Sequence, residues 1–372
     1  MMHERRFLPN FDWTFFFAVM ILVGIGLLSV YSATYSMGGG RHGLFVKQAW
    51  WLGIGAIVMM MSLMPDYHSL QRWAYPLYVA AVLSLAAVLV AGRTGMGAQR
   101  WLPLGPLSFQ PSEVAKLVLV ISLAKYFSED GVTEGHTLGQ LVKPFVMVVV
   151  PMALVVKQPD LGTALMLLFI FCAMVAVTGI KLRSLAYLVI TGILTMPVAW
   201  SFFWGHLKGY QKDRILTFIN PESDPSGAGY HVIQSKIAIG SGALTGKGYL
   251  NGTQSQLSFL PERHTDFIFS VISEEWGFVG SILVLLVFLF IILWGVEAAH
   301  RAKDRFGALI TVGVVSMISF YVIINIGMTL GIMPVVGVPL PLISYGGTSA
   351  LTTMVALGLV LNVNMRRYQL FY

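Results

Sequence analysis

The chain has 372 residues, of which 56% are hydrophobic and only 11% are charged. A water-soluble domain carries about a quarter charged residues, so this composition excludes an ordinary soluble protein and indicates one that crosses a membrane many times. The formal net charge of +7 is a signal of membrane orientation, because no stripe of interleaved basic and aromatic residues indicates a nucleic-acid partner. The single cysteine, Cys172, excludes a disulfide framework and is expected to be buried as a small apolar side chain.

About ten apolar stretches are long enough for membrane-spanning helices, which need about 20 residues each. They predict an all-α polytopic membrane protein forming a single transmembrane domain, residues 1–372, with a large loop at about 206–264 between the seventh and eighth helices. The spans are expected at roughly 11–34, 45–64, 73–92, 112–128, 141–157, 162–180, 184–205, 265–296, 306–332 and 346–365.

Basic residues in the short loops set the orientation, because such loops stay preferentially in the cytoplasm. With the N-terminus inside, most of these residues fall on the cytoplasmic side, among them Arg183, Arg305 and Arg367. We therefore predict that both termini are cytoplasmic and that the loop at about 206–264 is extracytoplasmic.

Four segments break the apolar pattern, and this orientation places all four on the outer side. The first, residues 92–113, is rich in Gly and Pro and leads into the fourth span. Ser112 is expected to cap that helix, with Glu113 in its first turn, where a carboxylate favours the positive helix end. Lys116 lies three residues further on, on the same helix face. We expect Glu113 and Lys116 to form an intramembrane ion pair or to line a polar cavity.

The second segment is a tight hairpin at 157–163, and two interpretations of its Asp160 stay open. The carboxylate can cap the next helix, or it can join Arg100 and Glu113, which lie on the same side, in a shared pocket.

The third segment is a long loop, and the fourth is an uncharged stretch between the last two spans. The loop at about 206–264 is long enough to bind or gate something, and its stretch Tyr230–Ile239 fits an interfacial amphipathic helix modestly. Residues 331–349 contain no charge but several prolines and glycines. Unwound backbone at membrane depth is tolerated only when buried or lining a cavity, so this segment either packs the last two helices or forms one wall of a substrate site.

The block 261–267 places four ionisable side chains directly before the long apolar run 268–294. A charge in the membrane costs about 2.5–3.5 kcal/mol on insertion scales and therefore indicates a function. Asp266 is the candidate for chemistry. Glu274 follows eight residues later, on roughly the same helical face, and either continues a polar channel together with Glu275 or pairs with a distant cation.

These outward-facing charges suit an anionic, lipid-linked substrate. Cations neutralise its phosphates, and a carboxylate takes a proton from an acceptor hydroxyl. Carboxylates and phosphate oxygens also suit Mg²⁺ or Mn²⁺, so Asp266 is alternatively a metal ligand. A carrier is the competing class, but it needs polar sites reachable from both faces, and a scaffold leaves the charges unexplained. The carboxylates are Glu113, Asp160 and Asp266, and the cations are Arg100, Lys116, Lys157 and Arg263.

Five motifs together resemble the SEDS family (shape, elongation, division and sporulation), and they run in family order over nearly the whole chain. They are Gln110–Glu113, Gln158–Thr163, Pro261–Phe269, Gly337–Pro341 and Ser344–Gly347. The arginine within PERHTDF and the short termini resemble the elongation branch of the family, since the division branch usually has alanine at that position.

The resemblance implies a ten-span peptidoglycan glycosyltransferase of the bacterial inner membrane, which polymerises lipid II into glycan strands during cell elongation. Its active site would face the periplasm, and its partners would be a class B penicillin-binding protein (a transpeptidase) and other membrane proteins of the elongation complex. An older proposal for the family, lipid II flipping, keeps the carrier alternative open. The essential aspartate of the family falls on Asp266, and the substrate-binding positions are expected at Arg100, Trp101, Glu113, Lys116, Asp160, Arg263, Ser344 and Tyr345.

Overall fold

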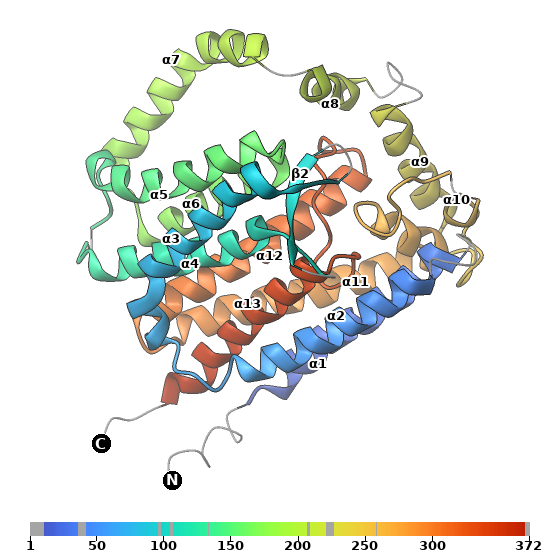
Figure 1. Ribbon diagram of the computed structural model, residues 1–372, viewed down its shortest axis with the longest axis horizontal. Helices are drawn as coiled ribbons and strands as arrows, with labels where there is room; N and C mark the ends of the chain where they lie inside the picture. Colours follow the sequence, from blue (N-terminus) through green and yellow to red (C-terminus); the bar gives the residue numbers. More distant parts are fainter. Residues whose placement is uncertain are drawn as a thin grey trace.

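The computed structural model describes residues 11–35, 42–95, 98–104, 107–132, 134–206, 209–220, 227–257 and 259–368. A long helix occurs at each of the ten ranges predicted from the sequence, which confirms the polytopic helical class (Figure 1). These helices are α1 (Trp13–Tyr35), α2 (His42–Met61), α3 (His68–Ala91), α4 (Pro111–Glu129), α5 (Leu138–Lys157), α6 (Leu161–Thr178), α7 (Leu182–His206), α11 (Ile268–His300), α12 (Arg305–Thr329) and α13 (Gly347–Met365).

Eight helices in the described part of the chain are long and apolar enough to cross a membrane. They include α1, α11, α12 and α13, whereas α4 carries several charged residues along its length. The side of the membrane on which each loop lies stays a prediction. Cys172 was expected to be buried, but it lies exposed on α6. Lipid covers the outer face of such a bundle, so an apolar side chain is stable there without protein contacts.

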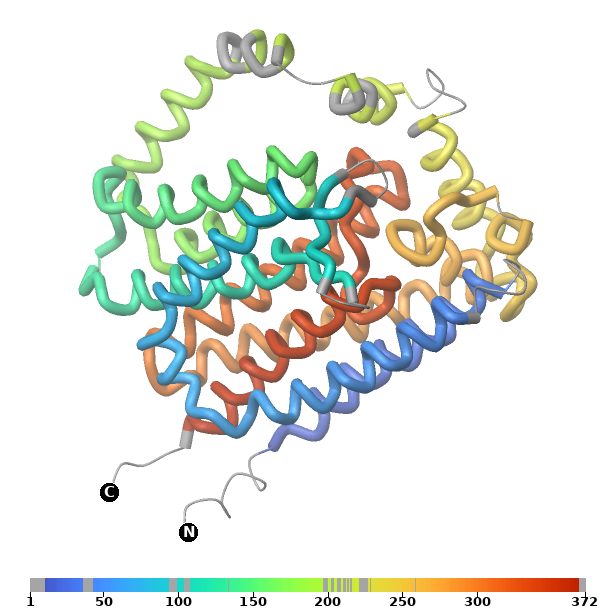
Figure 2. The backbone as a smooth tube through the Cα atoms, in the orientation of Figure 1, coloured from blue at the N-terminus to red at the C-terminus, as the bar shows by residue number. Residues whose placement is uncertain are grey.

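The large loop contains three further helices, α8 (Gly209–Ile219), α9 (Ala228–Ser241) and α10 (Thr253–Gln256). In Figures 1 and 2, α7 runs outward from the bundle, and the chain continues through α8 to α9 along one end of the molecule. The helix predicted at Tyr230–Ile239 is therefore present as α9. Its Ser235 is buried, shares a hydrogen bond of 2.7 Å with Ser270 and donates another of 2.6 Å to the carbonyl oxygen of Thr329. These bonds attach α9 to α11 and α12.

A small antiparallel sheet in the first irregular segment was not expected for an all-α protein. It consists of β1 (Arg93–Gly95), β2 (Ala98–Leu104) and β3 (Leu107–Phe109), paired in that order. Strands of three to seven residues are too short to show a clear alternation of apolar and polar residues. The sheet matters because β2 carries Arg100 and Trp101 to the end of the bundle where the other irregular segments gather.

α12 lies at the centre of the bundle and packs against α4, α6, α11 and α13. Close approach of α4 and α12 depends on Gly313, because a Cβ atom there would lie 2.5 Å from Val120. Small residues at helix crossings are typical of membrane bundles, since they let the backbones approach and increase van der Waals contact. The rigid centre holds the starts of α4 and α13 in fixed relative positions.

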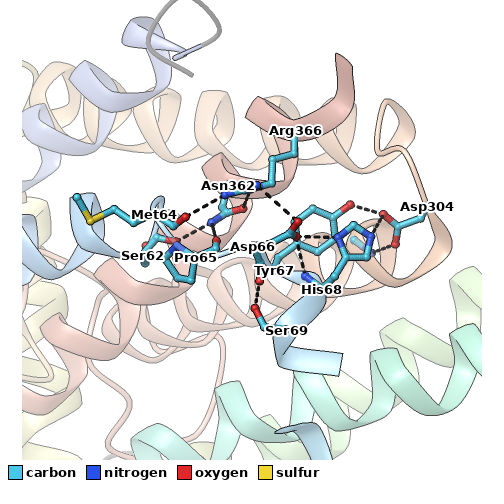
Figure 3. A network of polar contacts seen from close by, with 11 residues as sticks. Ser62, Met64, Pro65, Asp66, Tyr67, His68, Ser69, Asp304, Asn362 and Arg366 are labelled. Atoms are coloured by element: carbon cyan, nitrogen blue, oxygen red, sulfur yellow. Dashed lines mark hydrogen bonds and ion pairs between the residues drawn. The ribbon is translucent and has the colours of Figure 1, made fainter. Parts of the chain in front are cut away.

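The end of the bundle at which α13 terminates is closed by a network of polar side chains (Figure 3). Tyr67 donates a hydrogen bond to Asp304, and His68 lies between Asp304 and Asp66, with its Nε2 and Nδ1 atoms 3.3 and 2.7 Å from the two carboxylates. Arg366 approaches Asp66 at 3.6 Å and donates to the carbonyl oxygen of Met64 at 3.0 Å. The network joins the α2–α3 loop, the start of α12 and the end of α13.

Candidate functional site

At the other end of α13 lies a cavity of about 370 Å³. It is bounded by the starts of α4, α6 and α13, by β2, by the turn before α11 and by the segment that follows α12. Segments from all four irregular regions of the sequence thus meet at this end of the molecule. Seven of the predicted site residues line the cavity, namely Arg100, Trp101, Glu113, Lys116, Asp160, Asp266 and Tyr345.

Asp266 lies in the turn before α11, two residues ahead of Ile268. Its backbone carbonyl accepts a hydrogen bond of 3.0 Å from the side-chain amide of Asn325 on α12, and the same amide donates to Val338 at 2.8 Å. The side chain therefore projects into the cavity from a backbone that is fixed on two sides. Gly337 lies opposite with a φ of +72°, and a Cβ atom there would be 3.4 Å from the Asp266 carboxylate.

The surroundings of Asp266 favour its protonated form. Removal from bulk water and the nearby charge of Glu262 raise the pKa of the Asp266 carboxyl group to about 6, although Arg214 and Arg100 act in the opposite direction. A carboxylate with a pKa close to neutral is well matched to accept a proton near neutral pH.

Glu113 and Lys116 form the predicted ion pair, with 2.7 Å between the Lys116 Nζ and the Glu113 Oε1 atoms. Both side chains are buried, and both reach Tyr321 on α12. The Tyr321 hydroxyl donates to the Glu113 Oε2 atom at 2.9 Å and accepts a hydrogen bond from Lys116. These three side chains make a closed polar triad in the cavity wall, so both sequence expectations, ion pair and cavity lining, are confirmed together.

Asp160 also fulfils both interpretations. It caps α6, because its carboxylate accepts hydrogen bonds from the backbone amide of Thr163 at 3.2 Å and from the Thr163 hydroxyl at 3.0 Å. It lines the cavity as well, and its Oδ2 atom lies 3.8 Å from the Arg100 Nε atom. Arg100 in turn donates to the carbonyl oxygens of Gln158 and Pro159. The hairpin therefore fixes a cation and a carboxylate at one edge of the cavity.

Two predicted substrate-binding residues do not line the cavity. Arg263 is buried, with its guanidinium donating to the carbonyl oxygens of Ala33 at 2.8 Å and of Ser255. Ser344 donates to the Thr265 carbonyl oxygen at 2.6 Å and accepts a hydrogen bond from the Leu340 amide. Both side chains hold the backbone around the cavity through these hydrogen bonds. The motifs correctly predicted segments next to the cavity, but a motif does not show which of its side chains point into it.

The structure corrects the expected cap of α4 and decides between the two interpretations of Glu274. Ser112 does not cap α4, because Gln110 occupies the N-cap position and Pro111 the first turn. Glu274 pairs with a cation rather than extending a channel from Asp266. It is buried, lies 2.8 Å from the Lys247 ammonium and accepts hydrogen bonds from the backbone amides of Gln254 and Ser255. It therefore attaches the large loop to α11.

A family model described as a cell cycle protein, covering FtsW, RodA and SpoVE, matches residues 12–369. The chain belongs to this family. It is 40% identical to the peptidoglycan glycosyltransferase MrdB of Escherichia coli strain K12 over 353 residues, which cover 94% of each protein. It is 33% identical to the peptidoglycan glycosyltransferase RodA of Treponema pallidum, with 97% of this chain and 99% of that protein covered.

Solved structures show the same fold. A chain of a peptidoglycan synthase complex that coordinates polymerization and crosslinking matches with a TM-score of 0.82 at 35% identity, covering 96% of this chain and 99% of that one. RodA of Thermus thermophilus matches with a TM-score of 0.70 at 31% identity, covering 96% and 98%.

Several residues in the cavity or beside it could not be predicted from the sequence. Tyr321 lies within an apolar span, 205 residues from Lys116, and no local pattern predicts that contact. Asn325, one turn further along α12, likewise gave no signal. Glu262 and His264 are part of the PERHTDF block and line the cavity, but the sequence alone assigned them no role.

Among the described residues, no three His, Cys, Asp or Glu side chains lie close enough together to hold a metal ion. Metal binding by Asp266 therefore stays a prediction. The cavity presents a carboxylate, Asp266, and two cations, Arg100 and Lys116. This combination suits transfer of a group from a phosphorylated donor to a hydroxyl acceptor.

Proposed function

We propose that this chain is a peptidoglycan glycosyltransferase that polymerises lipid II into glycan strands during cell elongation. The observation that carries the proposal is the position of Asp266, a carboxylate with a raised pKa, in a cavity that also presents Arg100 and Lys116. Its relatives in Escherichia coli and Treponema pallidum bear the name peptidoglycan glycosyltransferase, and the matches cover nearly the whole of each protein.

Asp266 acts as the general base in this proposal. It removes the proton from the 4-hydroxyl of the acceptor GlcNAc, and the resulting oxygen attacks the anomeric carbon of the donor MurNAc. A new carbon–oxygen bond forms on one face while the bond to the phosphate oxygen breaks on the other, so the configuration inverts. The electron pair leaves with undecaprenyl diphosphate, and the proton stays on Asp266 until solvent takes it.

Arg100 and Lys116 stabilise the negative charge that develops on the leaving diphosphate. Each is held by a carboxylate, Asp160 and Glu113 respectively, so neither side chain has to be ordered when the substrate arrives. Preorganised charge of this kind stabilises a transition state without a reorganisation cost. Trp101 and Tyr345 supply aromatic surface in the same cavity, which suits the faces of sugar rings.

The same proposal includes the side of the membrane that the active site faces and the protein partner. The cavity lies at the end of the bundle that the loop-charge pattern assigns to the periplasm, where lipid-linked donors and growing glycan strands meet. The partner is a class B penicillin-binding protein of the elongation complex. Support comes from the structural match to a peptidoglycan synthase complex that coordinates polymerization and crosslinking.

The test is polymerisation of labelled lipid II by the purified chain together with its partner, with gel separation of the glycan products. We expect glycan strands to form and to be absent when Asp266 is replaced by Asn. Movement of lipid II across vesicle membranes without any polymer would contradict the proposal and favour a carrier. Repeating the assay with a chelator measures whether the reaction also needs a divalent cation.

A further inference from the structure

Glu262 lies four residues before Asp266 and lines the same cavity. Its carbonyl oxygen accepts hydrogen bonds from the backbone amides of Thr265 at 3.1 Å and Phe267 at 3.3 Å. The Thr265 hydroxyl lies 3.2 Å from that carbonyl oxygen and 3.3 Å from the Glu262 carboxylate. A tight turn thus carries the two acidic side chains, Glu262 at its start and Asp266 near its end.

The backbone of Glu262 adopts a φ of +49°, in the left-handed region. Glycine and asparagine occupy this region more readily than a residue with a long side chain. The turn itself therefore gives no reason for a glutamate here. Unfavourable backbone conformations of this kind concentrate at functional sites, where the surrounding structure enforces them, which points to a task for the carboxylate.

We propose that Glu262 and Asp266 work as a carboxylate pair, in which Glu262 is a positioning residue that tunes the acid–base behaviour of Asp266. The inference rests on the proposed function, since it concerns the proton that Asp266 accepts. Two carboxylates that face one small cavity repel each other when both are ionised, so the pair retains a proton at a pH where a single solvated carboxylate has lost it.

The charges around the pair support this arrangement. Burial raises the pKa of Asp266 most and Glu262 is the next largest cause, whereas Arg214 of α8 and Arg100 of β2 lower it and Asp160 raises it slightly. Arg100 is not a full counterion for Asp266, because its guanidinium lies 3.8 Å from Asp160 and also binds two carbonyl oxygens.

Other titratable groups also line the cavity, and among them Tyr321 is hydrogen-bonded to both Glu113 and Lys116. Lys116 forms an ion pair with Glu113 at 2.7 Å. His264 and Tyr345 line the cavity with their rings 5.8 Å apart. Within the described residues, Glu262 forms no ion pair. No cation in contact with Glu262 therefore offsets its effect on the cavity.

The experiment measures kcat/KM for lipid II polymerisation as a function of pH, with the chain in complex with its partner. Wild-type protein is expected to lose activity as the pH falls through about 6, the pKa of Asp266. Glu262→Gln should move this acid limb to lower pH. At pH values above this limb, Glu262→Gln should lose less activity than the factor of about 10²–10⁴ that removal of a general base costs.

Three variants make the result decisive. Glu262→Asn removes the charge while placing a residue that tolerates the left-handed turn, so it should shift the limb equally without loss of thermal stability. Glu262→Asp keeps the charge and should leave the limb near its wild-type position. Glu297→Gln is the matched control, because Glu297 pairs with Arg301 at the far end of α11 and is half exposed.

Two results would overturn the inference. One is an acid limb that stays at the wild-type pH in both Glu262→Gln and Glu262→Asn. The other is disappearance of the limb in His264→Gln, which would assign it to the histidine. If wild-type protein makes no polymer at all, the proposed function fails instead, and the two failures are thereby distinguished.

Discussion

The two ends of α13 both gather charged side chains, yet they differ in what the charges face. At its start, Asp160, Glu262 and Asp266 line a cavity of about 370 Å³. At its end, the network in Figure 3 closes on itself, with Asp66 and Asp304 facing His68 and neighbouring side chains. A cluster of charged residues is therefore not a site by itself. An open cavity between the charged groups distinguishes the functional end from the structural one.

The largest effect on stability is expected from breaking the ion pair in the cavity wall. Lys116→Met leaves the Glu113 carboxylate buried beside Tyr321 without its cation, which costs about 3–5 kcal/mol. Polymerisation should also be lost, because the variant removes a cation from the cavity. Thermal unfolding and the glycan assay measure the two effects.

The exchanged double variant, Glu113→Lys with Lys116→Glu, separates these two roles. Recovery of both stability and activity would show that the pair is only structural, like the network at the opposite end. Normal stability with continued inactivity would show that the ammonium group is needed at its own position.

The pH dependence should differ between activity and stability. Because the pKa of Asp266 in the folded protein is raised to about 6 from 3.8, the folded state binds a proton more tightly than the unfolded state between these values. The contribution of Asp266 to stability therefore increases as the pH falls through this window. Activity falls over the same range, by roughly tenfold per pH unit below the pKa, since the base is protonated. Chemical denaturation and initial rates at matched pH values check both directions.

A smaller effect is expected from Tyr321→Phe. The change removes the hydroxyl that bridges Glu113 and Lys116 but keeps the ring, so stability should fall by about 1.5–3 kcal/mol. We expect KM for lipid II to rise more than kcat falls, because the variant loosens Lys116 without removing its charge. An unchanged KM together with normal stability would contradict a role for the triad in holding the cation.

The smallest effect is expected at the closed end. His68 is nearly half exposed and contacts Asp66 and Asp304, so His68→Gln should change stability by about 0.2–1 kcal/mol. Its polymerisation rate should equal that of the wild type. A large loss of activity would mean that the two ends are coupled and would break the distinction between them.

Much of this architecture could be predicted from the sequence, because a continuous apolar run of about 20 residues crosses a membrane as an α-helix. The pairing of Glu113 with Lys116 could be predicted too, since residues three apart on a helix are neighbours. Tyr321 could not, because its contact with Lys116 depends on how α4 and α12 pack. The sequence also could not show that the Arg263 side chain points away from the cavity, because this depends on its hydrogen bonds to the carbonyl groups of Ala33 and Ser255.

The central claim is that Asp266 is the proton acceptor of a glycosyltransferase site. The most direct test compares wild type, Asp266→Asn and the control Glu297→Gln, each purified with the partner and given labelled lipid II. We predict that Asp266→Asn remains folded, because the amide avoids the cost of a buried charge, and polymerises at a rate about 10²–10⁴-fold lower. The control should polymerise at the wild-type rate. Near-normal glycan synthesis by Asp266→Asn would contradict the account.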